Sequence, residues 1–184
     1  RDLWPRILAL AQFLEESRGP EGFTAPDYSI WEEKSDPHDP RVELPRAYYA
    51  FTQAAAVAGL RAAAFVARVL GRGDLAERWE SRAWEITKAV LKRLWTPRGY
   101  FARSAWDRPG LPLDERVDAS SLAVIFLGVA GAPSGKGVSH IERVASELSF
   151  LEWGICRYLG DAYFHDAWYT PGGDEAKGPN PPWP

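Results

Sequence analysis

Residues 45–95 decide the fold: PRAYYAFTQAAAVAGLRAAAFVARVLGRGDLAERWESRAWEITKAVLKRLW. Over residues 45–70 apolar side chains recur at helical spacing, on a stripe formed by Phe51, Ala55, Ala58, Ala62, Val66 and Val69. Pro45 suits the first turn of a helix, and the segment carries very little charge. We therefore expect a helix over residues 45–70 that is buried on most of its sides.

The second half of this stretch predicts an amphipathic helix over residues 75–95. Its apolar stripe consists of Leu75, Trp79, Ala83, Ile86, Val90 and Leu94. The charged residues, including Arg82, lie off this stripe and should face water. Two glycines at 71 and 73 end the preceding helix, and Asp74 is a good N-cap for this one. A buried helix backed by a half-exposed helix is the unit that a concentric double layer of helices requires.

The rest of the chain adds further helices and long loops. The patterns predict helices over residues 3–16, 119–129 and 138–150. Asp118 should cap the second of these, which is another candidate inner helix. The third should bury a face formed by Ile141, Val144, Ala145 and Leu148. Residues 96–106 alternate in polarity and indicate a small β-hairpin, whereas residues 17–44 and the segment from Trp153 onward are expected to be loop. The fold class that we expect is all-α.

Composition excludes several classes of function. The net charge of −3 gives no reason to expect a nucleic-acid partner. Arg61 and Arg68 interrupt the most apolar run, residues 54–70, so we expect no membrane partner. The lone Cys156 excludes an internal disulfide, and without a signal-peptide pattern at the start we favour an intracellular location. The segment DPHDP (residues 36–40) is too tightly spaced among prolines for a metal site, and we expect neither a metal nor another cofactor.

The most informative short motif is DYSIWEE, at Asp27–Glu33, within the first long loop. Structureless loops of about 28 residues are uncommon in compact domains and are usually functional. A tryptophan directly before two glutamates offers two ways to raise the pKa of a carboxyl, namely burial against an apolar ring and a neighbouring like charge. An exposed acidic loop beside Lys34 is the plainer interpretation. Most of the nine tryptophans should pack in the core, but Trp31 and Trp183 lie in predicted loops.

Four motifs, in this order along the chain, resemble the glucoamylase family, glycoside hydrolase family fifteen. DYSIWEE is similar to the family's acid-bearing loop, and residues 49–71 are similar to the helix that follows it. ICRYLGDAYF (Ile155–Phe164) resembles a later active-site loop, and NPPWP (Asn180–Pro184) resembles the segment that begins the next inner helix. Ser29 departs from the pattern, because fungal members carry Asp at the aligned position.

The resemblance implies a barrel of six inner and six outer helices, an (α/α)6 toroid of the six-hairpin glycosidase type. Residues 1–184 would be a single partial catalytic domain from the middle of this barrel. Glu32 would be the general acid of an inverting hydrolase, and Glu33 would hold a sugar hydroxyl or tune Glu32. The other substrate-binding residues that the resemblance implies are Tyr28, Trp31, Arg157, Tyr158, Asp161, Tyr163 and Trp183. For Arg157 and Asp161, four residues apart, a local salt bridge that supports the loop is an alternative.

The family's general base lies near the C-terminal end of the barrel, and no candidate for that motif occurs in this chain. We therefore expect the chain to be inactive alone, to expose apolar helix faces, and to pair with the remainder of its own barrel. The expected ligand is a carbohydrate: an α-glucan, an oligosaccharide or trehalose. Two alternatives stay open, a non-catalytic glucoamylase-like carbohydrate-binding or regulatory domain and a phosphorylase on the same barrel.

Overall fold

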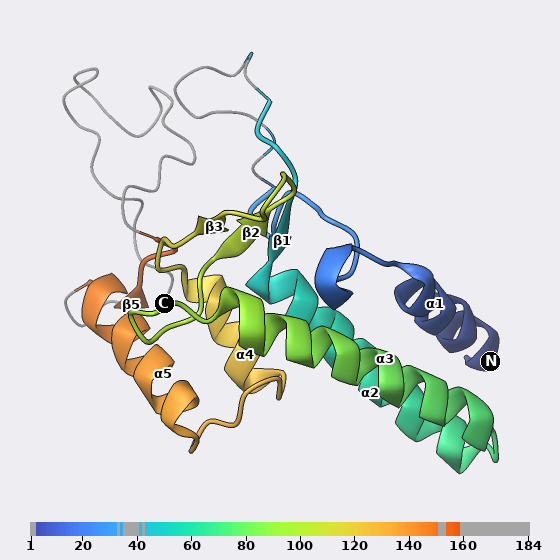
Figure 1. Ribbon diagram of the computed structural model, residues 1–184. Helices are drawn as coiled ribbons and strands as arrows, with labels where there is room; N and C mark the ends of the chain where they lie inside the picture. Colours follow the sequence, from blue (N-terminus) through green and yellow to red (C-terminus); the bar gives the residue numbers. More distant parts are fainter. Residues whose placement is uncertain (1–2, 33, 35–40, 42, 151–153, 159–184) are drawn as a thin grey trace.

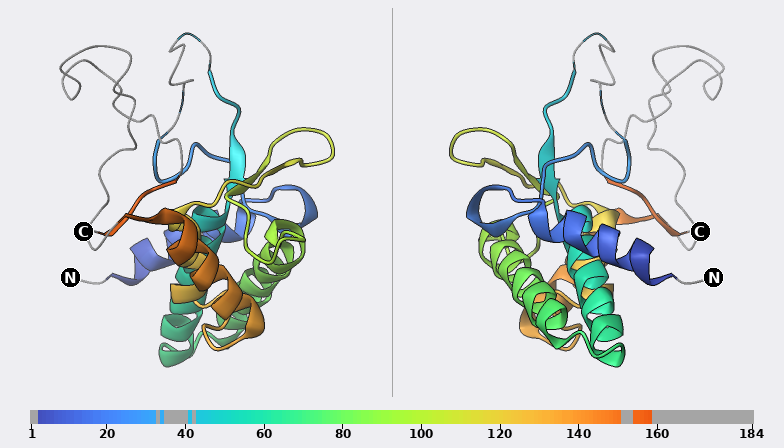
Figure 2. Two further views of the ribbon diagram at one scale, coloured as in Figure 1. Left: turned by 90° about the vertical axis from the view of Figure 1, so that its left-hand side faces the viewer. Right: turned by 90° about the vertical axis from the view of Figure 1, so that its right-hand side faces the viewer.

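The computed structural model describes residues 3–32, 34, 41, 43–150 and 154–158. The long helices lie together on one side of the molecule, and a small sheet lies on the other (Figure 1; Figure 2). The helical elements are α1 (Trp4–Glu16), η1 (Pro20–Gly22), α2 (Ala50–Val69), α3 (Gly73–Ala89), the π-helical turn η2 (Val90–Leu94), η3 (Ala119–Leu122), α4 (Ala123–Phe126) and α5 (Gly135–Leu148). The strands are β1 (Ala47–Tyr49), β2 (Ser104–Trp106), β3 (Leu113–Asp114), β4 (Ser149–Phe150) and β5 (Gly154–Ile155).

Helix α2 is the centre of the fold, as the buried helix of the predicted pair should be. It runs beside α3 and also contacts α1 and α4 (Figure 1). Its buried residues are Ala50, Gln53, Ala54, Ala56, Val57, Leu60, Ala63, Ala64 and Ala67. By length and composition alone, α2 is apolar enough to cross a membrane. Its packing against three other helices accounts for that composition.

The residues that recur at helical spacing along α2 do not form its buried face. Ala62 and Val69 are exposed, and the other members of the stripe are half-buried: Phe51, Ala55, Ala58 and Val66. In a helix with apolar residues on nearly every side, spacing does not single out the face that packs. The predicted start at Pro45 is also wrong, because residues 47–49 form strand β1 and the helix begins at Ala50.

The apolar stripe predicted for α3 is confirmed, because Trp79, Ala83, Ile86, Val90 and Leu94 are buried and Leu75 is half-buried. The ring of Trp79 lies 6.1 Å from that of Trp4 and joins α3 to α1. The N-cap position belongs to Arg72 rather than Asp74, which lies in the first turn of the helix. Helix α3 ends at Ala89 and continues as the π-helical turn.

The expected exposure of Arg82 is wrong, since its side chain is buried against the loop between α1 and β1. Its guanidinium donates to the carbonyl oxygens of Ser17 (2.8 Å), Gly22 (2.9 Å) and Phe23 (2.8 Å). The guanidinium has several N–H donors in a fixed planar arrangement and can reach all three carbonyl oxygens together. These hydrogen bonds replace those that the group would make to water at the surface. Arg82 therefore ties α3 to the start of the loop that later carries Trp31.

The predicted hairpin over residues 96–106 is right in part. Trp95 pairs with Phe101 across a turn, and residues 104–106 form β2. The strand β2 then pairs antiparallel with β1 and β3, so the partners of the strand lie outside the predicted segment. The resulting three-stranded sheet has the order β1-β2-β3.

Asp118 caps η3 as predicted, with its carboxylate accepting from the backbone N–H of Ser120 at 2.7 Å. The helix is shorter than expected, since α4 ends at Phe126 and Gly128 has a φ of 77°. Helix α5 buries Gly137, His140, Val144 and Leu148. The expected burial of Ile141 and Ala145 is wrong, because the hydrogen bonds of His140 turn a different face inward.

Apolar side chains remain exposed on several helices, as expected for a partial barrel. They are Leu3, Leu10, Phe13, Phe65, Val69, Leu70, Trp84, Phe126, Val138 and Ile141. Phe65 is 65% exposed and Phe126 is 68% exposed, although each lies on a helix whose opposite face is packed.

Candidate functional site

The loop that carries Trp31 and Glu32 is a tight turn with its own internal hydrogen bonds. The Ser29 N–H donates to Asp27 Oδ1 at 2.6 Å, and the Glu32 N–H donates to the Ser29 carbonyl at 3.1 Å. Ser29 and Glu32 have φ values of 72° and 52°, in the left-handed region that side chains other than glycine rarely adopt. At its base the loop pairs with β1 through two backbone bonds of 3.0 Å between Asp27 and Ala47. This turn gives Trp31 and Glu32 defined directions.

Trp31 is held by Asp118, which lies 87 residues further along the chain. The indole Nε1–H lies 3.2 Å and 3.1 Å from the two carboxylate oxygens of Asp118. The side chain of Asp118 is fully buried, and Arg103 Nε lies 2.9 Å from Asp118 Oδ2. Burial raises the pKa of the Asp118 carboxyl, and the charge of Arg103 opposes part of that rise. Asp118 is therefore a cap for η3 and an acceptor for Trp31 at once.

Arg103, on the segment leading into β2, is buried between two aromatic rings. Its guanidinium carbon lies 4.6 Å from the ring centre of Tyr158 and 5.5 Å from that of Tyr49. Its NH1 lies 3.7 Å from the carboxylate of Asp114. Asp114 is also held by Arg116, whose Nε donates to Asp114 Oδ1 at 2.9 Å. Burial raises the pKa of Asp114, but the two arginines together lower it further, so the net direction is downward.

The segment of the second motif lies against the same aspartate. Asp118 and Tyr158 form an antiparallel bridge, and the Ala119 N–H donates to the Arg157 carbonyl at 2.8 Å. The guanidinium of Arg157 stacks 5.0 Å from the ring centre of Trp31. Arg157 and Tyr158 are both buried. The structure thus brings together Trp31, Arg157 and Tyr158, three of the predicted site residues, from two distant segments.

The remaining predicted site residues are placed less closely. Glu32 is exposed, so the burial against Trp31 that the motif suggested is not found in the described chain. The hydroxyl of Tyr28 donates to Glu43 Oε1 at 2.5 Å, in a separate pocket that also contains Arg46. Lying outside the described residues are Glu33, Asp161, Tyr163, Trp183 and residues 36–40.

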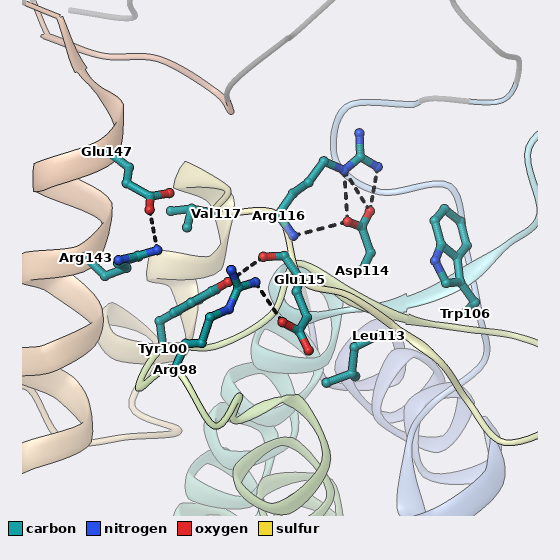
Figure 3. A pocket seen from close by; sticks show the side chains of 10 residues that line it. All are labelled: Arg98, Tyr100, Trp106, Leu113, Asp114, Glu115, Arg116, Val117, Arg143 and Glu147. Carbon is teal, nitrogen blue, oxygen red and sulfur yellow. Dashed lines mark hydrogen bonds and ion pairs between the residues drawn. The ribbon is translucent and has the colours of Figure 1, made fainter.

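A pocket of about 500 Å³ lies beside this cluster, between β3 and α5 (Figure 3). Its three arginines each have an acidic partner within the pocket: Arg98 with Glu115, Arg116 with Asp114, and Arg143 with Glu147. Because these charges neutralise one another, the pocket is better suited to a neutral polar ligand than to an anion. Its Asp114 wall belongs to the cluster around Arg103.

A buried chain of hydrogen bonds joins α5 to Asp118. The Phe101 N–H donates to His140 Nδ1 at 3.3 Å, so that nitrogen carries no proton. The proton therefore lies on His140 Nε2, which donates to Ser121 Oγ at 3.1 Å. Ser121 Oγ in turn donates to the Asp118 carbonyl at 2.5 Å. Burial lowers the pKa of His140 to about 4, so the imidazole is neutral at pH 7.

The sequence analysis missed two residues of this site and one of the two roles of a third residue. Arg103 and Asp114 were not predicted, and Asp118 was predicted only as a helix cap. The acidic and basic side chains of segment 103–118 were a weak indication of these roles. If a short β segment is buried, its charged side chains must be paired. Within the described part of the chain, no group of three or more His, Cys, Asp or Glu residues could hold a metal ion.

Comparison with solved structures supports the fold. The chain is similar to a bacterial glucoamylase solved in complex with acarbose, with 25% identity, a TM-score of 0.59, and coverage of 80% of this chain and 23% of that one. It is also similar in fold to a sialidase, with 14% identity, a TM-score of 0.67, and coverage of 85% of this chain and 14% of that one. The chain therefore spans less than a quarter of either protein. No protein-family model and no curated protein matches the sequence. The fold is all-α and corresponds to part of a glucoamylase-like helical barrel.

Proposed function

We propose that this chain is part of an inverting glycoside hydrolase of the glucoamylase type, which releases glucose from α-glucosidic oligosaccharides or polysaccharides. The observation that carries the proposal is the contact between Trp31 and Arg157, with the guanidinium 5.0 Å from the ring centre. These residues come from the two loops whose sequences resemble active-site loops of that family. The likeness to a bacterial glucoamylase at 25% identity supports the same assignment. Residues 1–184 would form one partial catalytic domain.

In this proposal Glu32 is the general acid, and it donates a proton to the oxygen of the scissile glycosidic bond. A second carboxylate, outside this chain, activates the attacking water from the opposite face of the sugar, at about 6.5–9.5 Å from the first. The exposed position of Glu32 leaves its carboxyl open to a bound substrate. Substrate and the rest of the barrel would enclose it in the working enzyme. The roles of Tyr28, Glu33, Asp161, Tyr163 and Trp183 in substrate binding belong to the same proposal.

The exposed apolar side chains of the helices support a second part of the proposal, that the rest of the barrel covers them. Phe65 and Val69 on α2, and Phe126 on α4, are large and exposed next to well-packed faces. Large apolar side chains left exposed beside packed faces favour an interaction with another part of the protein. Since the chain spans 23% of the glucoamylase that it resembles, the partner that we propose is further helices of the same barrel.

The test is glucose release from maltooligosaccharides by the complete protein. Glu32→Gln should lower kcat by about 10²–10⁴-fold, because it removes the donated proton while keeping the size of the side chain. Glu77→Gln, at an exposed position on α3, is the matched control and should have wild-type turnover. Full activity of Glu32→Gln would show that the acid is another residue.

The configuration of the first product tests the inverting mechanism. Proton NMR of the fresh reaction should show β-glucose before mutarotation, whereas α-glucose would indicate retention. Binding of oligosaccharide without any turnover by the complete protein would favour the non-catalytic domain instead. Glucose 1-phosphate formed only with inorganic phosphate would favour the phosphorylase. The 184-residue chain alone should have no turnover.

A further inference from the structure

Two contacts, at opposite ends of the Trp31 loop, hold it to the rest of the described chain, in addition to side-chain bonds of Asp27 with Thr52 and of Tyr28 with Glu43 near its base. The first is the backbone pairing of Asp27 with Ala47 at its base. The second is the tip residue Trp31, whose indole N–H is bound by Asp118 and whose ring lies against Arg157. The internal bonds of the turn fix its own shape but not its tilt toward the helices. Among these contacts, that of Trp31 restrains the tip of the turn, next to Glu32.

The backbone of this turn needs such an external restraint. Ser29 and Glu32 both adopt positive φ without being glycine. Such conformations are unfavourable and persist where the surrounding structure determines them. The hydrogen bond from the Trp31 indole to Asp118 restrains the backbone in this conformation, one residue before Glu32. Loss of this bond would let the turn pivot about its base and carry the Glu32 carboxyl with it.

Asp118 is itself a rigid anchor. Its carboxylate is fully buried, accepts from the Ser120 N–H at 2.7 Å, and lies 2.9 Å from Arg103 Nε. Its backbone carbonyl accepts from Ser121 Oγ, which is bound in turn to His140. Asp118 is therefore held in place through both its side chain and its backbone. An acceptor fixed in this way can hold a loop in one orientation.

We propose that Asp118 is a positioning residue that, through the indole N–H of Trp31, sets the direction of the Glu32 carboxyl toward the scissile bond. The inference rests on the proposed function for the identity of the reaction, but the restraint on Trp31 is a separate claim. Asp118 does not touch substrate in this account. Its removal therefore lowers kcat and leaves substrate binding nearly unchanged, because misplacement of a catalytic group by about 1 Å can cost about 10²-fold in rate.

The experiment compares two aspartates in the complete protein, each of which accepts a hydrogen bond from an aromatic side chain. Asp118→Asn replaces the carboxyl group that accepts from Trp31, whereas the control Asp107→Asn replaces the carboxyl group that accepts from the Tyr48 hydroxyl at 2.7 Å, outside the candidate site. Each variant is made with 5-fluorotryptophan, and the ¹⁹F resonance of Trp31 is assigned by its loss in Trp31→Phe. Both kcat and KM for maltooligosaccharides are measured.

The expected result for Asp118→Asn is a fall in kcat of about tenfold to a hundredfold, a KM within about twofold of wild type, and a shifted or broadened Trp31 resonance. Asp107→Asn should leave the Trp31 resonance in place and kcat within about threefold. The proposal is overturned if Asp118→Asn moves the resonance without lowering kcat, or if both variants lose kcat alike with the resonance unmoved.

Two further outcomes are also decisive. If Asp118→Asn does not fold, Trp31→Phe takes its place, since it removes the N–H donor and leaves Asp118 and Arg103 intact. An unchanged kcat in Trp31→Phe overturns the proposal, and a fall of about tenfold at similar KM supports it. If the wild-type protein releases no glucose, the proposed function fails and the assignment of Glu32 fails with it. The ¹⁹F spectra then still show whether Asp118 holds Trp31.

Discussion

Replacement of His140 tests the buried chain of hydrogen bonds that joins α5 to Asp118. His140 accepts from the Phe101 N–H and donates to Ser121 Oγ, and its side chain is fully buried. A proton added to Nδ1 would break the first bond and leave a charge without water. His140→Gln removes the titration and keeps an amide that can donate to Ser121.

The magnitude follows from the two pKa values of the imidazole. Its ordinary value is 6.5, and burial lowers it to about 4 in the folded protein. The unfolded chain therefore takes up a proton first as the pH falls, and folding loses stability between pH 6.5 and about 4. The full difference corresponds to about 3 kcal/mol of unfolding free energy, present above pH 6.5 and absent below about pH 4.

The assay is urea unfolding of the wild type and His140→Gln at several values between about pH 7.5 and pH 4.5. The quantity of interest is the difference between their free energies of unfolding. The described carboxyls with shifted pKa values titrate in both proteins, so their contributions cancel: Asp27, Glu85, Asp114 and Asp118. The stability advantage of the wild type should shrink by about 2–3 kcal/mol as the pH falls over this range.

Lys136→Gln is the control on the same helix. Its ammonium lies 3.7 Å from the ring centre of Trp95, and a lysine keeps its charge throughout this range of pH. The difference between wild type and Lys136→Gln should therefore not vary with pH. If the wild-type and His140→Gln stability curves run parallel from pH 7.5 to pH 4.5, His140 is not held neutral by the fold and the reasoning is refuted.

Three further predictions concern the fold. Arg82→Lys should lower the free energy of unfolding by about 3 kcal/mol in urea, since one ammonium cannot replace bonds to three carbonyls, while exposed Arg78→Lys should cost less than about 1 kcal/mol. Gly137→Ala should cost about 2 kcal/mol or more in thermal unfolding, because its Cβ would lie 2.2 Å from the Gly131 carbonyl oxygen; wild-type stability would contradict this packing of α5. Phe65→Ser should reduce the binding of a hydrophobic dye to the 184-residue chain and leave its unfolding free energy within about 0.5 kcal/mol, since the ring is 65% exposed.

The accuracy of the sequence predictions follows the strength of each local pattern. The α3 stripe was found because charged and apolar residues separate cleanly around that helix. The buried face of α2 was not found, because alanines surround the helix and tertiary contacts decide which of them pack. Strand β1 was missed for a related reason, since its partners in β2 lie far along the chain: Ala47 pairs with Trp106 and Tyr49 pairs with Ser104.

In the candidate site, too, features with a local sequence pattern were predicted and features that depend on distant contacts were not. The motif containing Trp31 and the segment containing Arg157 were each visible in the sequence, and the structure brings them together. Arg82 was misplaced because a buried polar residue looks exposed until its hydrogen-bond partners are known. The second role of Asp118 could not be predicted, since no local pattern relates a helix cap to an indole 87 residues away.

The long separation between Trp31 and Asp118 has a consequence for the order of folding. Their contact closes a segment of 87 residues and needs α2, α3 and the sheet to be in place between them. The α2–α3 hairpin is local and forms at a smaller cost in chain entropy. The turn that carries Glu32 is therefore among the last parts to be ordered, and among the first to open under mild denaturant. With Glu32 in its proposed role, activity should be lost at a lower denaturant concentration than helical structure, so the loss of activity would report the first local unfolding of the protein.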